Sequence, residues 1–283
     1  MKFDYFAPAT QEEAIKLLSK YDGKAKVIAG GTDLVVRMKN KFIKPEYVID
    51  LENISGLDSI KYNAKQGMTI GALTKVSAVE NSPLVKRHYP ALAFAAGQLG
   101  SVAIRNLATI GGNLCNAAPS AENAPSLLCL SARVKIVGPN GTRELPLEEF
   151  FAGPGKTVLD KGEILTEIRI PAPVTGSKAV YFKHCPRGGS DLAIVGVAAM
   201  AVYSRGTCKD IKVALGAVAS TPIRANKAEQ VLIGKKVDEK LINKCAAVAA
   251  GEACCISDVR GSAEYRREMV EVFTRRAIKA LMA

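Results

Sequence analysis

This chain of 283 residues has few aromatic side chains and few histidines. It contains no tryptophan, aromatic residues make up 6% of the chain, and histidine occurs twice. Proteins that bind single-stranded nucleic acid interleave aromatic with basic side chains, so this composition argues against nucleic acid as a partner. The chain also lacks an uninterrupted apolar run of about 18 residues, the length that a membrane-spanning helix requires. We therefore expect a globular protein without a membrane span.

Closely spaced cysteines are missing as well. The seven cysteines are scattered along the chain, and no two of them form a CxxC pair. Because structural zinc sites and iron–sulfur clusters need about four ligands at close spacing, we expect no metal site in this chain. The odd number of cysteines and the absence of an apolar signal core near the N-terminus predict reduced thiols in the cytoplasm. Most should be buried as small apolar side chains, but Cys115 lies inside a glycine-rich segment.

Basic residues outnumber acidic ones by 39 to 27, which gives a formal net charge of +12. Much of the excess lies near the C-terminus, in Arg260, Arg266, Arg267, Arg275, Arg276 and Lys279. Apolar residues such as Val270, Phe273 and Ala277 recur between these cations at helical spacing, which predicts the solvated face of a helix. An acidic protein partner or a polyanionic ligand is the alternative.

Turn residues and hydrophobic periodicity divide the chain into three units, at residues 1–55, 56–173 and 177–283. In the first unit a capping box from Thr10 to Glu13 predicts a helix, and strands are expected at residues 26–28 and 47–51. The second unit should contain strands at 68–72, 134–137 and 164–170, helices at 90–99 and 124–132, and Thr74 as a helix cap. The third should contain strands at 179–183, 192–203 and 211–219, then helices at 239–253 and 263–282. Segregated strands and helices of this kind indicate the α+β class.

Two glycine-rich segments are the most informative patterns in the chain. The first glycine segment, residues 29–35, reads AGGTDLV, and the second, residues 109–125, reads TIGGNLCNAAPSAENAP. Each follows an apolar run and should offer backbone N–H groups to the oxygens of a phosphate, because glycine carries no side chain. Neither segment contains the GxGxxG or the GxxxxGK[ST] pattern. The pair therefore suggests a dinucleotide site outside the Rossmann and P-loop classes.

Simpler interpretations of both segments remain open. The first can be a turn that ends a strand, with Thr32 and Asp33 capping the element that follows. In the second, Glu122 can accept hydrogen bonds from ribose hydroxyls, or it can supply a negative charge to the N-terminus of the next helix.

The segments AGGTDLV, IRNLATIGGNLCNAAPSAENAP, LPLEEFF and GEILTEIRIP together resemble the FAD-binding medium subunit of the molybdenum hydroxylases. That family includes subunits of xanthine dehydrogenase, nicotinate dehydrogenase and molybdenum-type carbon monoxide dehydrogenase. The resemblance covers essentially the whole chain. It implies an FAD-binding fold of two α+β subdomains, similar to the vanillyl-alcohol-oxidase type, followed by a C-terminal three-stranded sheet packed with helices.

The resemblance also implies which residues hold FAD, and it implies non-covalent binding because the first glycine segment has no histidine or cysteine. One side of the diphosphate would be lined by Val27, Ile28, Ala29, Gly30, Gly31, Thr32, Asp33 and Leu34. The other side would be lined by Thr109, Ile110, Gly111, Gly112 and Asn113. Glu122 stands where relatives have aspartate and would contact the ribose, while Leu99 would contact the adenine. Leu165 and Lys183 would approach the flavin, although Lys183 can also be a surface lysine on a strand; no residue is expected to act as a nucleophile or general base.

By the same resemblance the chain would be one part of a heterotrimer. A small subunit would carry 2Fe-2S clusters, and a large subunit would carry molybdopterin and oxidise a purine or another N-heterocycle. FAD in this chain would pass the electrons to NAD+ or another acceptor. The alternatives are a free-standing FAD-dependent oxidase or reductase, and a nucleotide-binding assembly protein without redox chemistry.

Overall fold

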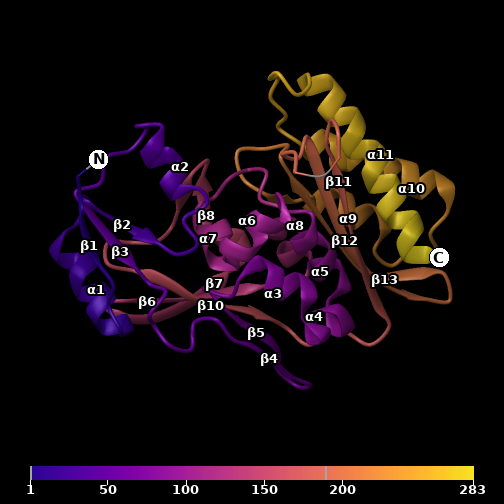
Figure 1. Cartoon of the computed structure of the whole chain (residues 1–283). Coiled ribbons are helices and arrows are strands. Elements are labelled where there is room, and N and C mark those ends of the chain that lie inside the picture. Colours follow the sequence, from indigo (N-terminus) through magenta and orange to yellow (C-terminus); the bar gives the residue numbers. More distant parts are fainter. Residues whose placement is uncertain (1, 189) are drawn as a thin grey trace.

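The structure, a computed structural model, describes residues 2–188 and 190–283. Three sheets follow one another along the chain, and Figure 1 shows them as an elongated series from the indigo N-terminal unit to the yellow C-terminal helix. A small additional sheet joins β8 (Phe151–Gly153) to β9 (Lys156–Thr157). The α+β class expected from the sequence is confirmed.

The N-terminal unit is a parallel sheet with two helices. Its strands pair in the order β1 (Asp4–Phe6), β3 (Tyr47–Asp50) and β2 (Ala25–Ile28). Helix α1 (Gln11–Lys20) begins after Thr10, whose hydroxyl accepts a hydrogen bond from the Glu13 N–H, as the capping box predicts. Helix α2 (Leu34–Lys39) begins inside the first glycine segment. The sequence does not predict β1, because three residues are too few to establish an alternating pattern.

The middle unit is a five-stranded antiparallel sheet covered by short helices. Its strands lie in the order β4 (Ile60–Asn63), β5 (Gly67–Gly71), β10 (Ile164–Ile170), β6 (Arg133–Gly138) and β7 (Gly141–Pro146). Its helices are α3 (Val76–Asn81), α4 (Pro83–His88), α5 (Pro90–Gly97), α6 (Val102–Leu107), α7 (Ile110–Cys115) and α8 (Asn123–Cys129), with a 3-10 turn, η1, at Leu147–Glu149. One expectation is wrong: Lys75, not Thr74, precedes α3, and the Thr74 hydroxyl donates to the Ser59 carbonyl at 3.5 Å.

The C-terminal unit is an antiparallel sheet with three helices on one face. Its strands are β11 (Ser177–His184), β12 (Val195–Ser204), β13 (Thr207–Gly216) and β14 (Ile223–Arg224), in that order. Its helices are α9 (Asn226–Leu232), α10 (Glu239–Glu252) and α11 (Ala263–Met282). The sheet has four strands rather than the expected three, because β14 is a two-residue strand without a sequence signal of its own.

Two helices of the middle unit, α5 and α8, connect it to the C-terminal sheet. Helix α5 contacts β11, and α8 contacts β12 and β13. One buried core therefore runs from Met68 and Ile70 on the middle sheet, through Leu92 and Leu127 on the helices, to Met200 on the C-terminal sheet. This shared core fixes the C-terminal sheet next to α8.

The basic C-terminal helix is only in part the solvated face that its spacing predicts. Arg267 and Arg276 are exposed, but the Arg266 side chain is only 2% exposed. Its guanidinium donates to the carbonyl oxygens of Ile194 and Ala217 and pairs with Asp258 at 2.7 Å. Arg266 therefore ties α11 to the sheet rather than facing solvent.

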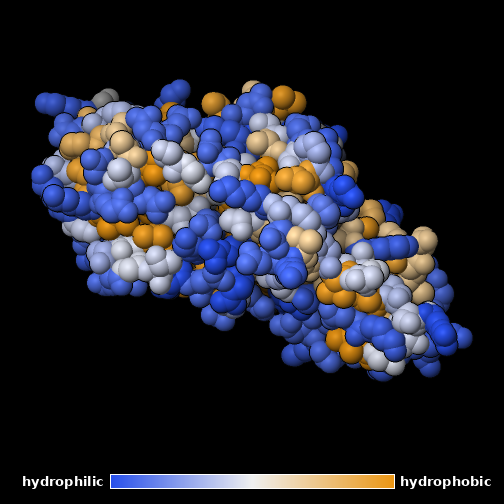
Figure 2. Space-filling view, turned by 90° about the horizontal axis from the view of Figure 1, so that it is seen from below, coloured by the Kyte–Doolittle hydropathy of each residue, from blue (hydrophilic) through white to orange (hydrophobic). Residues whose placement is uncertain are grey.

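The outer surface seen from below is mostly hydrophilic, with apolar residues in small separate patches (Figure 2). Within the described part of the chain, none of the helices combines the length and the apolar character that crossing a bilayer requires.

Candidate functional site

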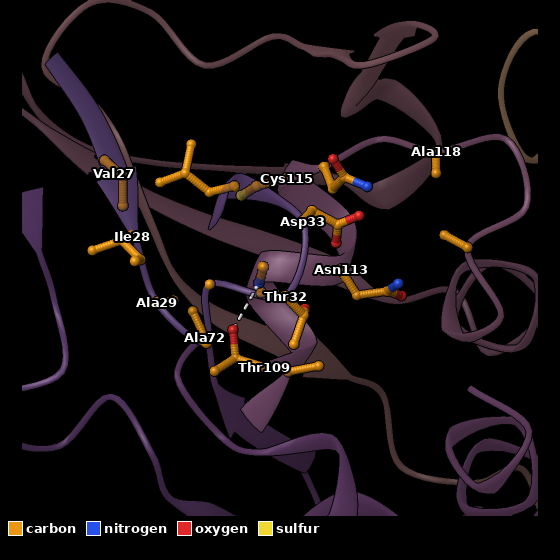
Figure 3. Close-up of a pocket in the computed structure, with 18 of the residues that line it drawn as sticks. Val27, Ile28, Ala29, Thr32, Asp33, Ala72, Thr109, Asn113, Cys115 and Ala118 are labelled. Atoms are coloured by element: carbon orange, nitrogen blue, oxygen red, sulfur yellow. Dashed lines mark hydrogen bonds between the residues drawn. The ribbon is translucent and has the colours of Figure 1, made fainter. Parts of the chain in front are cut away.

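A cleft of about 410 Å³ opens between the N-terminal and middle units. Both glycine segments contribute to its walls, and Figure 3 shows the first of them curving past α7. Among the residues that the sequence assigns to cofactor binding, all except Ile110 and Lys183 line this cleft. Residues about eighty positions apart in the chain are thus brought to one place.

The first glycine segment presents a row of free backbone donors. No residue in the described part of the chain accepts a hydrogen bond from the N–H groups of residues 30–34. Gly31 has a φ of +70°, a left-handed conformation that glycine adopts without strain. A Cβ on Gly30 would lie 1.9 Å from the carbonyl oxygen of Leu107, so this glycine is required for packing against α6. Five consecutive N–H groups without an acceptor therefore belong to residues that line the cleft, an arrangement that suits an anion.

The second glycine segment differs from the expectation. Residues 110–115 form helix α7 rather than an open turn, and Thr109 caps it by accepting a hydrogen bond from the Gly112 N–H at 3.0 Å. The N–H groups of Ile110 and Gly111 donate to the carbonyl oxygens of Thr74 and Ala72, at 3.0 and 2.9 Å.

The next N–H, that of Asn113, donates to the Thr109 carbonyl at 2.9 Å. Every N–H from 110 to 113 is thus used inside the protein, so the bare backbone donors expected at Gly111 and Gly112 are not available to a ligand. Among residues 110–113, the side chain of Asn113, drawn in Figure 3, is the polar group that remains for the cleft.

Glu122 and Lys183 form a buried ion pair at the edge of the cleft. The lysine Nζ lies 3.0 Å from Glu122 Oε1 and donates to the Gln98 carbonyl at 2.8 Å. The exposed fractions of the two side chains are 2% for Lys183 and 7% for Glu122, so the alternative of a surface lysine is excluded. Burial raises the pKa of the Glu122 carboxyl, and the ammonium of Lys183 opposes this shift. Lys183 holds Glu122 in place and does not itself line the cleft.

Asp33 brings a second carboxyl group to the cleft. It stands at the N-terminus of α2 but its side chain makes no capping hydrogen bond, so its oxygens remain free. Burial raises its pKa, and Arg37 one helical turn later counteracts the shift. Asp33 also raises the pKa of Glu122 through charge repulsion.

Apolar side chains form the rest of the lining. Leu99 and Leu165, which the resemblance assigns to the adenine and the flavin, are buried residues of the lining, and Ile104, Leu159 and Leu192 also line the cleft. Sequence reasoning did not assign the last three: Leu159 and Leu192 lie outside the helices and strands, and Ile104, although it opens a quoted segment, was given no contact with the cofactor. It also missed Arg37, although its position four residues after Asp33 on α2 is a signal that could have been used.

Cys115 and the two histidines play structural parts. Cys115 lines the cleft, but burial raises its pKa to about 12, so its thiol is neutral and a poor nucleophile. His88 stacks on Tyr62 with ring centroids 3.7 Å apart. His184 shares a hydrogen bond of 2.7 Å with the Tyr265 hydroxyl. The described residues contain no group of three or more histidine, cysteine, aspartate or glutamate side chains that could hold a metal ion.

Comparison with protein families assigns both parts of the chain. Residues 1–173 match the model of the FAD binding domain in molybdopterin dehydrogenase, and residues 180–281 match the carbon monoxide dehydrogenase flavoprotein C-terminal domain.

Individual relatives match over nearly their whole length. The glyceraldehyde dehydrogenase medium chain of Sulfolobus acidocaldarius is 34% identical, covering 98% of each chain. The carbon monoxide dehydrogenase medium chain of Afipia carboxidovorans is also 34% identical, covering 99% of this chain and 97% of its own. Among solved structures, a chain of carbon monoxide dehydrogenase from Hydrogenophaga pseudoflava matches with a TM-score of 0.97 and 34% identity, covering 100% of this chain and 98% of that one.

Proposed function

The chain belongs to the FAD-binding subunits of the molybdenum hydroxylases, and from this premise we propose that it positions FAD for electron transfer within a larger complex. The complex is a cytoplasmic heterotrimer. Its small subunit carries the 2Fe-2S clusters that donate electrons, and its large subunit carries molybdopterin and oxidises the organic substrate. The final acceptor is NAD+ or another soluble compound that reaches the flavin.

The cleft fits a dinucleotide cofactor in three respects. Its volume of about 410 Å³ falls in the usual range for cofactor clefts, roughly 300–1,000 Å³. The free N–H groups of residues 30–34 suit a diphosphate, and the carboxyl groups of Asp33 and Glu122 suit ribose hydroxyls. The leucine side chains of the lining suit the flat faces of adenine and flavin. The row of free N–H groups is the observation that carries the proposal.

Each group of the chain then has a defined task. The N–H groups of residues 30–34 and the amide of Asn113 bind the diphosphate, and Glu122, held by Lys183, accepts a hydrogen bond from a ribose hydroxyl. Leu99 and Leu165 exclude water from the rings. Bound FAD supplies the exchange of single electrons on one side and of electron pairs on the other. None of the side chains that line the cleft is required to move a proton or to form a covalent bond.

The location in the cytoplasm agrees with the cysteines, since all seven are free thiols. The need for partners follows from the metal chemistry. We place the clusters and the molybdenum cofactor in the partner subunits, and the lack of a metal-binding group among the described residues agrees with this. The substrate is accordingly chosen outside this chain.

The test is purification of the full chain together with the proteins encoded beside it. We expect a yellow protein from which equimolar FAD is released by denaturation without proteolysis, in a complex with one small cluster-bearing and one large subunit. Reduction of the flavin by the organic substrate should require the whole complex. Turnover of an organic donor by the isolated chain would instead establish a free-standing oxidase or reductase. A colourless chain that binds ADP as tightly as FAD would establish a nucleotide-binding assembly protein.

A further inference from the structure

Asn123, the first residue of α8, is completely buried but makes only one side-chain hydrogen bond. Its exposed fraction is 0%, and its Nδ2 donates to Oδ1 of Asn113 at 3.1 Å. The other end of its amide, Oδ1, has no partner among the described residues. The contact with Asn113 is therefore the one polar interaction that this buried side chain makes.

Asn123 is a poor choice of residue if stability alone is considered. Burial of an amide group costs free energy unless both of its ends find hydrogen-bond partners. A leucine of similar shape would fill the same space among the buried residues of α8 without an unpartnered oxygen. The benefit of the asparagine must therefore lie in what it does to Asn113.

The contact favours one direction of the Asn113 amide, because turning both amides over would keep the bond but leave the buried NH2 group of Asn123 without an acceptor. Because Asn113 Oδ1 accepts from Asn123, the NH2 group on the opposite side of the same amide is directed elsewhere. Asn113 lines the cleft, and none of the described residues accepts a hydrogen bond from its NH2 group. The N–H groups of residues 110–113 are already bonded inside the protein, so among these four residues the NH2 group of Asn113 is the donor left for a ligand.

We propose that Asn123 is a positioning residue for the cofactor: it locks the Asn113 amide with its NH2 group facing the FAD diphosphate. This inference rests on the proposed function, since it needs FAD in the cleft. Without the lock, half of the Asn113 amide orientations would present an oxygen to the anionic phosphate, which repels it.

Two substitutions separate this role from a purely structural one. In N123L the Asn113 amide turns freely, so FAD binds about threefold more weakly, while the melting temperature of the flavin-free chain is unchanged or higher. In N123D the new carboxylate can only accept, so Asn113 turns its NH2 group away from the cleft. FAD should then bind at least tenfold more weakly, which corresponds to a loss of about 1.4 kcal/mol in binding free energy. If Asn123 has only a structural role, N123L should instead lower the melting temperature of the flavin-free chain and leave FAD binding unchanged.

The decisive measurement is a double-mutant cycle with N113A, in which FAD, ADP and riboflavin are titrated into the full flavin-free chain. We expect N123D to weaken FAD and ADP by the same factor, to leave riboflavin unaffected, and to have no effect once Asn113 is replaced. A loss that persists in the N113A background, or that extends to riboflavin, would overturn the proposal. Failure of the unsubstituted chain to bind FAD would instead refute the proposed function, so the two failures are distinguishable.

Discussion

Gly30 and Gly111 lie where the backbone of another segment leaves no room for a side chain. A Cβ on Gly30 would lie 1.9 Å from the Leu107 carbonyl oxygen, and one on Gly111 would lie 2.6 Å from Ala72. Gly31 is needed for its backbone conformation instead. These glycines shape the cleft before any ligand enters, because they let the first glycine segment and α7 approach their neighbours closely.

Replacement of Gly30 by alanine tests this packing. The added Cβ must displace the backbone at Leu107, so we expect Gly30→Ala to lower the free energy of unfolding by about 3 kcal/mol. Gly251, inside α10, is the matched control, because a Cβ added there would meet no atom of another segment within 4 Å. At that position the same substitution should raise stability by up to about 1 kcal/mol, because alanine favours helix. Urea unfolding of both variants is the measurement, and an unchanged midpoint for Gly30→Ala would contradict the assignment.

Removal of Lys183 from its ion pair with Glu122 should lower the stability of the protein by an amount that depends on pH. Lys183→Met leaves the Glu122 carboxyl buried without its counter-ion, which should cost about 3 kcal/mol of stability at pH 8. Burial already raises the Glu122 pKa, and removal of the ammonium raises it further. The folded state then binds the Glu122 proton more tightly than the unfolded state does. Stability is therefore highest below the pKa that Glu122 has in the unfolded chain, and it falls as the pH rises through the pKa that Glu122 has in the folded chain.

Urea unfolding of Lys183→Met at pH 5.5 and pH 8 therefore should show the larger loss at pH 8. The double variant Lys183→Met/Glu122→Gln is the control, since it has no buried charge and should lose this pH dependence. An equal loss at both pH values would mean that Glu122 stays ionised without its partner.

At the scale of elements, α7 shows how a weak helix sequence is stabilised. Two of its six residues are glycines, which disfavour helix, but Thr109 caps it and Gly111 packs against Ala72. Thr109→Val keeps the shape of the side chain and removes the acceptor of the Gly112 N–H. We expect a loss of about 2 kcal/mol in the free energy of unfolding, because a half-buried donor is left unpaired.

Thr10→Val at the exposed start of α1 provides the comparison for that variant. The same chemical change there leaves an N–H that water can satisfy, so its cost should be nearer to about 0.5–1 kcal/mol. Equal losses in the two variants would show that burial adds nothing to the capping interaction of Thr109.

Elements with strong periodicity are predictable from this sequence, and contacts between distant segments are not. Strand β10 and helix α11 occupy the residues that their alternating and helical patterns predict. Strand β14 and helix α9 are not predicted because they are short. Strand β14 pairs with β13 and helix α9 packs on α10, and the local sequence does not reveal these neighbours.

The candidate site likewise has parts that the sequence predicts and contacts that it does not. The glycine segments can be recognised from residue types alone, and they do meet in one cleft. The acceptors that use up the N–H groups of Ile110 and Gly111 lie on residues 72 and 74, more than thirty positions earlier, so the sequence suggests free donors where none remain. Asn123 also carries no sequence signal, because its role depends on a contact with a side chain ten residues away.

At the scale of the whole molecule, the cleft depends on all three units. The first unit supplies the free N–H groups, and the second supplies Asn113 and Glu122. The C-terminal unit supplies Leu192 to the lining and Lys183 to the ion pair with Glu122. A ligand in the cleft is therefore expected to stabilise the C-terminal sheet as well as the two units that touch it most.

Because all three units contribute to the cleft, we expect FAD to protect β11 as well as the first glycine segment from hydrogen exchange. FAD at about 100 times its dissociation constant should add about 2.7 kcal/mol to the free energy of unfolding. Because the core is continuous from the middle sheet to the C-terminal sheet, the gain should be seen as one cooperative transition at a higher temperature. The lysine variant Lys183→Met, which removes the link between β11 and Glu122, should reduce the protection of β11 more than that of residues 30–34. If FAD instead protects residues 30–34 and leaves β11 unchanged in the unsubstituted chain, the C-terminal unit takes no part in holding the cofactor.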